Sequence, residues 1–191
     1  MDPKSAELDA RLDMDQKKVL FVYSLYSNEL KLVFLQYTAI LVICFYLMKK
    51  GLFPNYKDQL LVYDYKNSRR YLWEDKKFMA DINILRDHDT LIRARARSKE
   101  YRDVNSHQCS TIGQKFLDDV NFANSPEGQE ILKLLNCKCG NLYQVILEDQ
   151  GPFLRCSHCK SEIFVENFLY DLHKPITYPL KAFFVCGDVD E

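Results

Sequence analysis

The sequence predicts an α+β protein in which a mainly helical domain is followed by a small β domain stabilised by a metal ion. Three observations lead to this fold class. Apolar residues follow a helical period over Glu74–His88, apolar and basic residues then alternate strictly over Leu91–Arg97, and two close pairs of cysteines stand near the end of the chain. With 191 residues and 47% hydrophobic content, the chain can form one domain or two small ones.

The N-terminal part is predicted to be helical. After a polar lead, a short helix is expected over Lys17–Tyr26. A long helix should then begin at a cap in residues 27–28 and end at Gly51, because Ser, Asn and Gly are favoured at those positions. A further helix is expected over Tyr56–Tyr65, before a polar break over Lys66–Arg70.

An uncharged run of seventeen residues, Leu32–Met48, lies near the short limit for a membrane span. The polar residues Gln36 and Thr38 inside the run, and the glycine just after it, favour a buried core helix. A membrane-anchored protein with a cytosolic zinc domain is a lower alternative.

The helix over Glu74–His88 places Phe78, Ile82 and Leu85 on one apolar stripe. In the strand that follows, Ile92, Ala94 and Ala96 are expected to face inward and the intervening arginines outward. The segment Lys99–Gln108 should pair back as a hairpin partner.

Two helix starts follow the hairpin. Thr111 and Gln114 fit a capping box, in which the threonine is the cap and the glutamine reaches back to it. Ser125 and Pro126 fit a cap followed by a first helical position. The second of these helices leads directly to Cys137.

The cysteine pattern predicts a metal site. Cys137-Lys-Cys139 is followed by sixteen residues and then by Cys156-Ser-His-Cys159. A strand, a turn and a returning strand between the pairs would bring four thiolates around one ion, the usual arrangement of a structural Zn²⁺ site. Gly140 can take the left-handed backbone conformation after the second ligand.

Other interpretations of these cysteines stay open. They could be ordinary buried or redox cysteines, or they could bind iron as in rubredoxin. The Cys-x-Cys spacing is tighter than the usual Cys-x-x-Cys, and His158 is the nearest spare ligand.

Charge is unevenly distributed. Residues 66–102 hold eleven Lys and Arg against six Asp and Glu, a balance of +5, whereas the remainder holds fifteen against twenty-one, a balance of −6. A basic middle between acidic flanks favours a localised anionic partner, although a solvated face of mixed charge would look the same. The scattered cysteines Cys44, Cys109 and Cys186 and the polar N-terminus favour an intracellular, cytoplasmic location.

An enzyme is not predicted. The four histidines do not have the spacing of a nucleophile or metal-hydrolase site, and a glycine-rich phosphate loop is absent from the sequence.

The segments Ile82–Ile92 and Thr111–Leu117, with the basic strand between them, resemble the winged helix-turn-helix transcription regulators of the PadR and MarR type. The resemblance covers residues 28–121 and departs from the pattern at Asp89-Thr90, where those proteins have glycine. It implies a DNA-binding transcriptional regulator whose recognition helix, Glu74–His88, enters the major groove of double-stranded DNA.

The resemblance also implies which residues contact DNA. The recognition helix would contact base edges or phosphates, and the wing would contact the phosphate backbone or a minor groove. The candidate DNA-binding residues are Lys76, Lys77, Asn83, Arg93, Arg95, Arg97 and Arg102.

A winged helix followed by a zinc ribbon is also similar in architecture to archaeal transcription factor E. That likeness favours the main alternative, a protein-interaction factor of the transcription machinery. The expected organisation is a lead and helix over 1–27, a winged-helix domain over 28–121, a connecting helix over 122–136, and a zinc ribbon with C-terminal segment over 137–191. The N-terminal helices could supply a homodimer interface.

Overall fold

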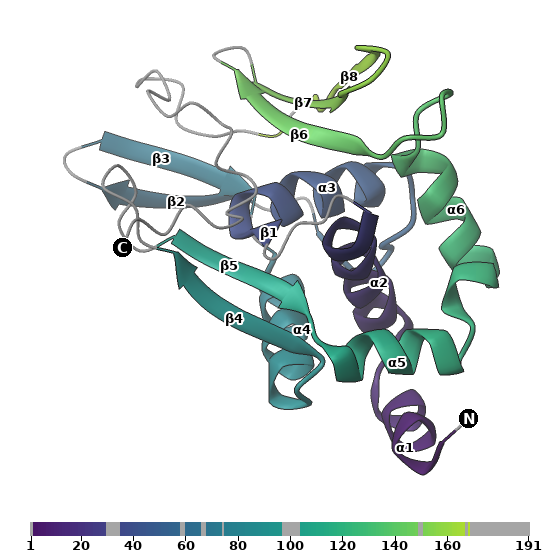
Figure 1. Cartoon of the computed structure of the whole chain (residues 1–191). Coiled ribbons are helices and arrows are strands. Elements are labelled where there is room, and N and C mark those ends of the chain that lie inside the picture. Colours follow the sequence, from purple (N-terminus) through teal and green to yellow (C-terminus); the bar gives the residue numbers. More distant parts are fainter. Residues whose placement is uncertain are drawn as a thin grey trace, which may run out of the picture.

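The structure, a computed structural model, describes residues 2–29, 35–57, 60–65, 68–73, 75–96, 104–148, 151–166 and 168 (Figure 1). It confirms a mixed α+β fold with a cysteine cluster near the C-terminus. The helices are α1 Pro3–Arg11, α2 Met14–Glu29, α3 Tyr37–Lys49, α4 Lys76–Asp87, α5 Thr111–Asp119, the short 3₁₀ helix η1 Phe122–Asn124, and α6 Pro126–Leu135. The strands are β1 Leu35–Gln36, β2 Leu60–Tyr65, β3 Ser68–Trp73, β4 Leu91–Ala96, β5 Val104–Cys109, β6 Tyr143–Glu148, β7 Gly151–Cys156 and β8 Glu162–Phe164.

Helices α2 and α3 form the centre of the molecule, with the other elements arranged around them (Figure 1). The α3 side chains from Ala39 to Leu47 are buried, which confirms the expected core helix over these residues. Burial of each large apolar side chain contributes about 1.5–3 kcal/mol. No helix in the described part of the chain is long and apolar enough to cross a membrane.

One hydrophobic cluster joins the N-terminal helices to the C-terminal sheet. The buried hydroxyl of Tyr26 on α2 donates a hydrogen bond to the carbonyl of Tyr143 on β6, with an O···O distance of 2.7 Å. The C-terminal sheet, in the order β6-β7-β8, therefore rests on the helical core.

The predicted basic hairpin is confirmed. Strands β4 and β5 pair antiparallel with Leu91 opposite Cys109, and the two-residue strand β1 pairs with the other edge of β5. The resulting sheet has the order β1-β5-β4. Asp89, in the turn before β4, has φ of 56°, a left-handed conformation that aspartate tolerates better than most residues.

The prediction of a helix over Tyr56–Tyr65 is wrong, and so is the predicted break over Lys66–Arg70 in its described part, residues 68–70. Strands β2 and β3 form an antiparallel hairpin in which Leu60 lies opposite Trp73. The valine of β2 and the aromatic residues of both strands favour extended backbone, and only residues 66–67 separate the strands. The buried Trp73 ring then packs among the rings of Phe45, Tyr56 and Phe78.

The predicted helix start in residues 27–28 is also wrong. Helix α2 continues through both residues to Glu29, and α3 begins only at Tyr37. The α2 side chains Val22, Tyr23 and Tyr26 are buried, so tertiary packing carries the helix past residues that would serve as caps elsewhere.

Two local predictions around the hairpin are corrected. Ile92 was expected to face inward but is 49% exposed, whereas its neighbour Leu91 is buried. Strict alternation shows that successive side chains point to opposite faces of the strand, but it does not show which face is buried. In β4 the buried Leu91 lies on the face that turns to the core. The cap of α5 is Ser110 instead of Thr111, because the Ser110 hydroxyl accepts the hydrogen bond from the Gly113 amide at 2.9 Å.

Candidate metal centre and neighbouring surfaces

The four predicted cysteines converge. The sulfur atoms of Cys137, Cys139, Cys156 and Cys159 all lie within 4.8 Å of one another. The Sγ–Sγ distances are 3.0 Å from Cys137 to Cys139, 3.2 Å from Cys137 to Cys159 and 3.5 Å from Cys139 to Cys156. The tight Cys-x-Cys spacing therefore does not keep Cys137 out of the cluster.

The β6–β7 hairpin brings the two cysteine pairs together. Tyr143, at the start of β6, lies opposite Cys156, at the end of β7. The bridge between Asn136 and Leu142 holds the first pair beside that end of the hairpin. As expected, two strands lie between the pairs, and Gly140 is left-handed, with φ of 83°.

This donor set fits one tetrahedral metal ion. Four sulfurs at about 2.3 Å from a Zn²⁺ ion would lie about 3.8 Å apart, close to the observed spacing. All four cysteines are free of disulfide bonds, and Cys137 and Cys156 are buried while Cys139 and Cys159 are exposed. These residues can hold a metal ion, and the exposed residue His158 does not belong to the cluster.

Hydrogen bonds lower the pKa of both exposed thiols. The hydrogen bond from Cys137, followed by that from Asn141, lowers the pKa of Cys139 to about 6. A hydrogen bond with Ser161 lowers the pKa of Cys159. Thiolates are the metal-binding form of cysteine, so this environment favours ligation near neutral pH.

Sequence reasoning missed Asn141 and Ser161, although a signal for them exists. Each follows the residue after the second cysteine of a pair, in Cys139-Gly-Asn141 and in Cys159-Lys-Ser161. The Asn141 side-chain amide lies 3.2 Å from the sulfur of Cys139, and the Ser161 hydroxyl lies 3.2 Å from that of Cys159.

The candidate DNA-binding residues of α4 lie in different environments. Lys76 and Asn83 are exposed, and the Asn83 side-chain oxygen accepts a hydrogen bond from Arg86 at 3.1 Å. Arg93, on β4, is exposed as well. The side chain of Arg95 and the whole of Arg97 and Arg102 lie outside the described residues.

Lys77 instead takes part in a polar network with α2. Its Nζ lies 2.7 Å from Asp81, 3.1 Å from Asp13 and 3.6 Å from Asp15. The Asp81 and Asp15 side chains are only 3% and 2% exposed. Asp81 also accepts a hydrogen bond from the buried Tyr56 hydroxyl at 2.9 Å. We call these five residues the Lys77 network, which ties α4 to α2.

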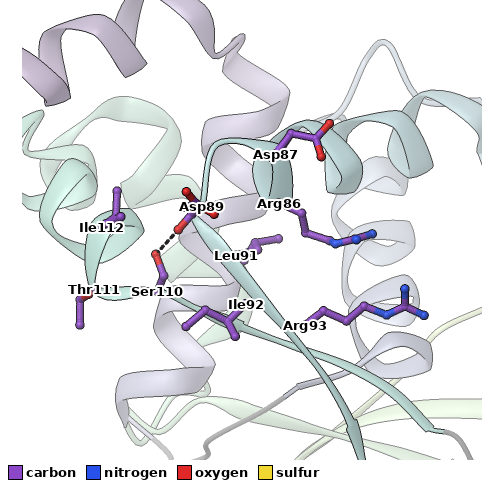
Figure 2. Close-up of a pocket in the computed structure, with 9 residues that line it drawn as sticks. All are labelled: Arg86, Asp87, Asp89, Leu91, Ile92, Arg93, Ser110, Thr111 and Ile112. Atoms are coloured by element: carbon purple, nitrogen blue, oxygen red, sulfur yellow. Dashed lines mark hydrogen bonds between the residues drawn. The ribbon is translucent and has the colours of Figure 1, made fainter.

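A groove lies where α4, β4 and the start of α5 meet, with a volume of about 460 Å³ (Figure 2). Figure 2 shows Arg86 and Arg93 extending to the same side of β4, while Ile92 and Ile112 lie on its other side. These two isoleucines are 49% and 48% exposed. Asp87 and Asp89 complete the charged rim, so the groove combines exposed apolar surface with both signs of charge.

A protein-family model described as the uncharacterized protein MJ1567 family matches residues 15–163. This span is most of the chain and includes all four clustered cysteines, so the chain belongs to that family. No curated protein and no solved structure gives a significant match.

Proposed function

We propose that this member of the MJ1567 family is a DNA-binding transcriptional regulator, built as a winged helix-turn-helix with a structural zinc site. The observation that carries the proposal is the order of elements. Helix α2, strand β1, helix α3, the hairpin β2–β3, helix α4 and the hairpin β4–β5 follow one another, and β1 pairs with the second strand of the β4–β5 hairpin. Three helices followed by a two-stranded wing is the arrangement expected of this DNA-binding fold.

In this proposal α4 is the recognition helix. Its exposed positions are Lys76, Ala80, Asn83 and Asp87, which recur at helical spacing along one side. An amide and an ammonium group on this side are suited to base edges and phosphates. The β2–β3 hairpin between α3 and α4 is an addition to the minimal fold.

The proposed role of Lys77 changes with the geometry. A lysine bound to three aspartates is a poor phosphate ligand, since the carboxylates would repel the DNA backbone. We therefore assign the phosphate contacts to Lys76 and to the arginines of the wing, residues 93, 95 and 97, and assign Lys77 to holding α4 in place.

The experiment is a fluorescence anisotropy titration of a labelled mixed-sequence duplex at several salt concentrations. The triple variant Arg93→Ala, Arg95→Ala, Arg97→Ala should bind every sequence more weakly. Its plot of log affinity against log salt should be shallower by about 0.9 per lost phosphate contact. Lys133→Ala, a lysine of α6 whose side chain is 73% exposed, serves as the matched control and should bind like the parent. A triple variant that binds like the parent at every salt concentration would rule out the wing as the binding surface.

A second candidate function is a protein-interaction factor of the transcription machinery. The groove of Figure 2 favours it, because Ile92 and Ile112 expose apolar surface beside charged residues. The acidic Asp87 on the exposed side of α4 also weakens attraction to phosphate. If the parent protein shows no DNA binding even at low salt, this second function replaces the first.

We further propose zinc as the metal, held by all four cysteines. Its support is the donor set, since four thiolates in a closed tetrahedral arrangement are typical of structural zinc. Zinc would contribute folding free energy to the β6–β7–β8 sheet, which is too small to be stable alone.

A further inference from the structure

Polar side chains contact both exposed sulfurs of the metal centre. The Asn141 amide lies 3.2 Å from the sulfur of Cys139, and the Ser161 hydroxyl lies 3.2 Å from the sulfur of Cys159. The other two ligands, Cys137 and Cys156, are protected by burial. Each sulfur of the centre is thus either shielded by the core or approached by one polar side chain.

The two cysteine loops share a common backbone arrangement. In the first, the Cys137 amide donates to the carbonyl of Asn141 at 2.9 Å. In the second, the Cys156 amide donates to the carbonyl of Ser161 at 2.9 Å. The preceding residues, Gly140 and Lys160, are both left-handed, with φ of 83° and 62°. The residue after the left-handed turn therefore closes each loop through its carbonyl and reaches the second cysteine through its side chain.

In the first loop, the short spacing of the cysteines makes the Asn141 side chain a hydrogen-bond donor to Cys139. Only one residue separates Cys137 from Cys139, and the Cys139 amide is directed at the sulfur of Cys137 at 3.3 Å. The Asn141 side-chain amide supplies the donor directed at the sulfur of Cys139 itself. Once Cys159 is a metal-bound thiolate it has no proton, so the Ser161 hydroxyl must be the donor there.

Four thiolates around a divalent ion leave a net charge of −2, which N–H and O–H donors stabilise. Donors that contact ligating groups also fix their orientation and slow their exchange with solvent. Without the side-chain donors, the exposed thiolates would keep only the backbone amides of Asn141 and Ser161 and the surrounding water.

We infer that Asn141 and Ser161 are a matched pair of positioning residues, which hold the exposed thiolates of Cys139 and Cys159 on the metal ion and retard its loss. This inference rests on the proposed metal centre but goes beyond it, because it assigns the retention of the metal to two residues that are not ligands.

The test compares Asn141→Ala, Ser161→Ala and the double variant with the parent. Ser157→Ala is the matched control, because Ser157 is an exposed serine between two ligands and its side chain makes no hydrogen bond to a ligand sulfur in the described structure. Zinc affinity is measured by competition with a chromogenic chelator, and the rate of zinc loss is measured on the loaded protein in excess EDTA. Cobalt-substituted protein reports the ligand field through its thiolate-to-metal absorption bands.

Each alanine variant should bind zinc about 10- to 100-fold more weakly, the usual effect of losing an outer hydrogen-bond partner. The double variant should bind zinc more weakly than either single variant, and the two effects should be coupled because both residues act on ligands of one metal ion. Ser161→Thr keeps the hydroxyl and should restore most of the affinity. The cobalt bands should shift in the alanine variants and stay in place in Ser157→Ala.

Unchanged affinity, release rate and cobalt spectrum in both alanine variants would overturn the inference and leave the metal centre intact. A parent protein that binds neither zinc nor cobalt would overturn the metal centre and this inference together. Measuring the release rate from the loaded, folded protein keeps the comparison valid for a variant whose metal-free form folds poorly.

Discussion

Replacing Lys77 by methionine tests whether this residue belongs to the interior of the protein. The substitution keeps most of the aliphatic side chain but removes the charge that lies 2.7 Å from Asp81 and 3.6 Å from Asp15. Removing one partner from a buried ion pair typically costs about 3–5 kcal/mol. Lys77 is 32% exposed, and Asp81 keeps hydrogen bonds from Gln16 and Tyr56, so we expect a smaller loss of about 2 kcal/mol.

In a chain of 191 residues, that loss corresponds to a fall in Tm of about 4–8 °C. The assay is urea unfolding followed by the emission of Trp73, the single tryptophan of the sequence, which is fully buried in the folded protein. Lys76→Met is the control, since Lys76 is the exposed neighbour on the same helix and its loss should change stability by less than about 0.5 kcal/mol. Equal stability of the two variants would refute the structural role of the Lys77 network.

Three further predictions concern stability and metal binding. Burial, followed by the charges of Arg86 and Arg93, lowers the pKa of His107 from 6.5 to about 4, so folding favours the neutral ring. The contribution of His107 to the free energy of unfolding is fully present above pH 6.5 and should fall by about 2 kcal/mol between pH 7 and pH 5. In parallel urea titrations, His107→Phe should not show this loss. In Gly113→Ala the new methyl carbon would lie 2.5 Å from the Thr90 carbonyl oxygen, so a thermal scan should show a loss of about 1–3 kcal/mol; an unchanged Tm would mean that α5 packs differently. Cys156→Ser should lose the metal and the hydrogen-exchange protection of the β6–β7 hairpin, and full metal content by elemental analysis would contradict the four-cysteine site.

The features that sequence could predict depend on local pattern. The apolar stripe of α4, the β4–β5 hairpin and the convergence of the cysteines follow from helical spacing, alternation and paired ligands, none of which requires knowledge of distant contacts. Ser125 likewise caps α6 as expected, because a cap depends only on the next few residues.

The failures depend on tertiary context. The leucines within Tyr56–Tyr65 favour a helix, but the strand β3, which pairs with Leu60–Tyr65 and makes it a strand, begins after two intervening residues. The face of β4 that is buried depends on the contact of Leu91 with the core, and the alternation of residues in the sequence cannot show that contact. The Lys77 network joins residues more than sixty positions apart in the sequence. Sequence pattern alone therefore predicts Lys77 to be a surface charge that is available to DNA.

A salt titration of the parent protein is the most direct test of the proposed DNA binding by α4 and the wing. With four phosphate contacts, from Lys76 and the three wing arginines, log affinity for duplex DNA should fall against log salt with a slope of about −3 to −4. We expect a slope in that range for the parent and a shallower slope for the triple arginine variant. Affinity that does not vary with salt, or no binding at the lowest salt concentration, would contradict it.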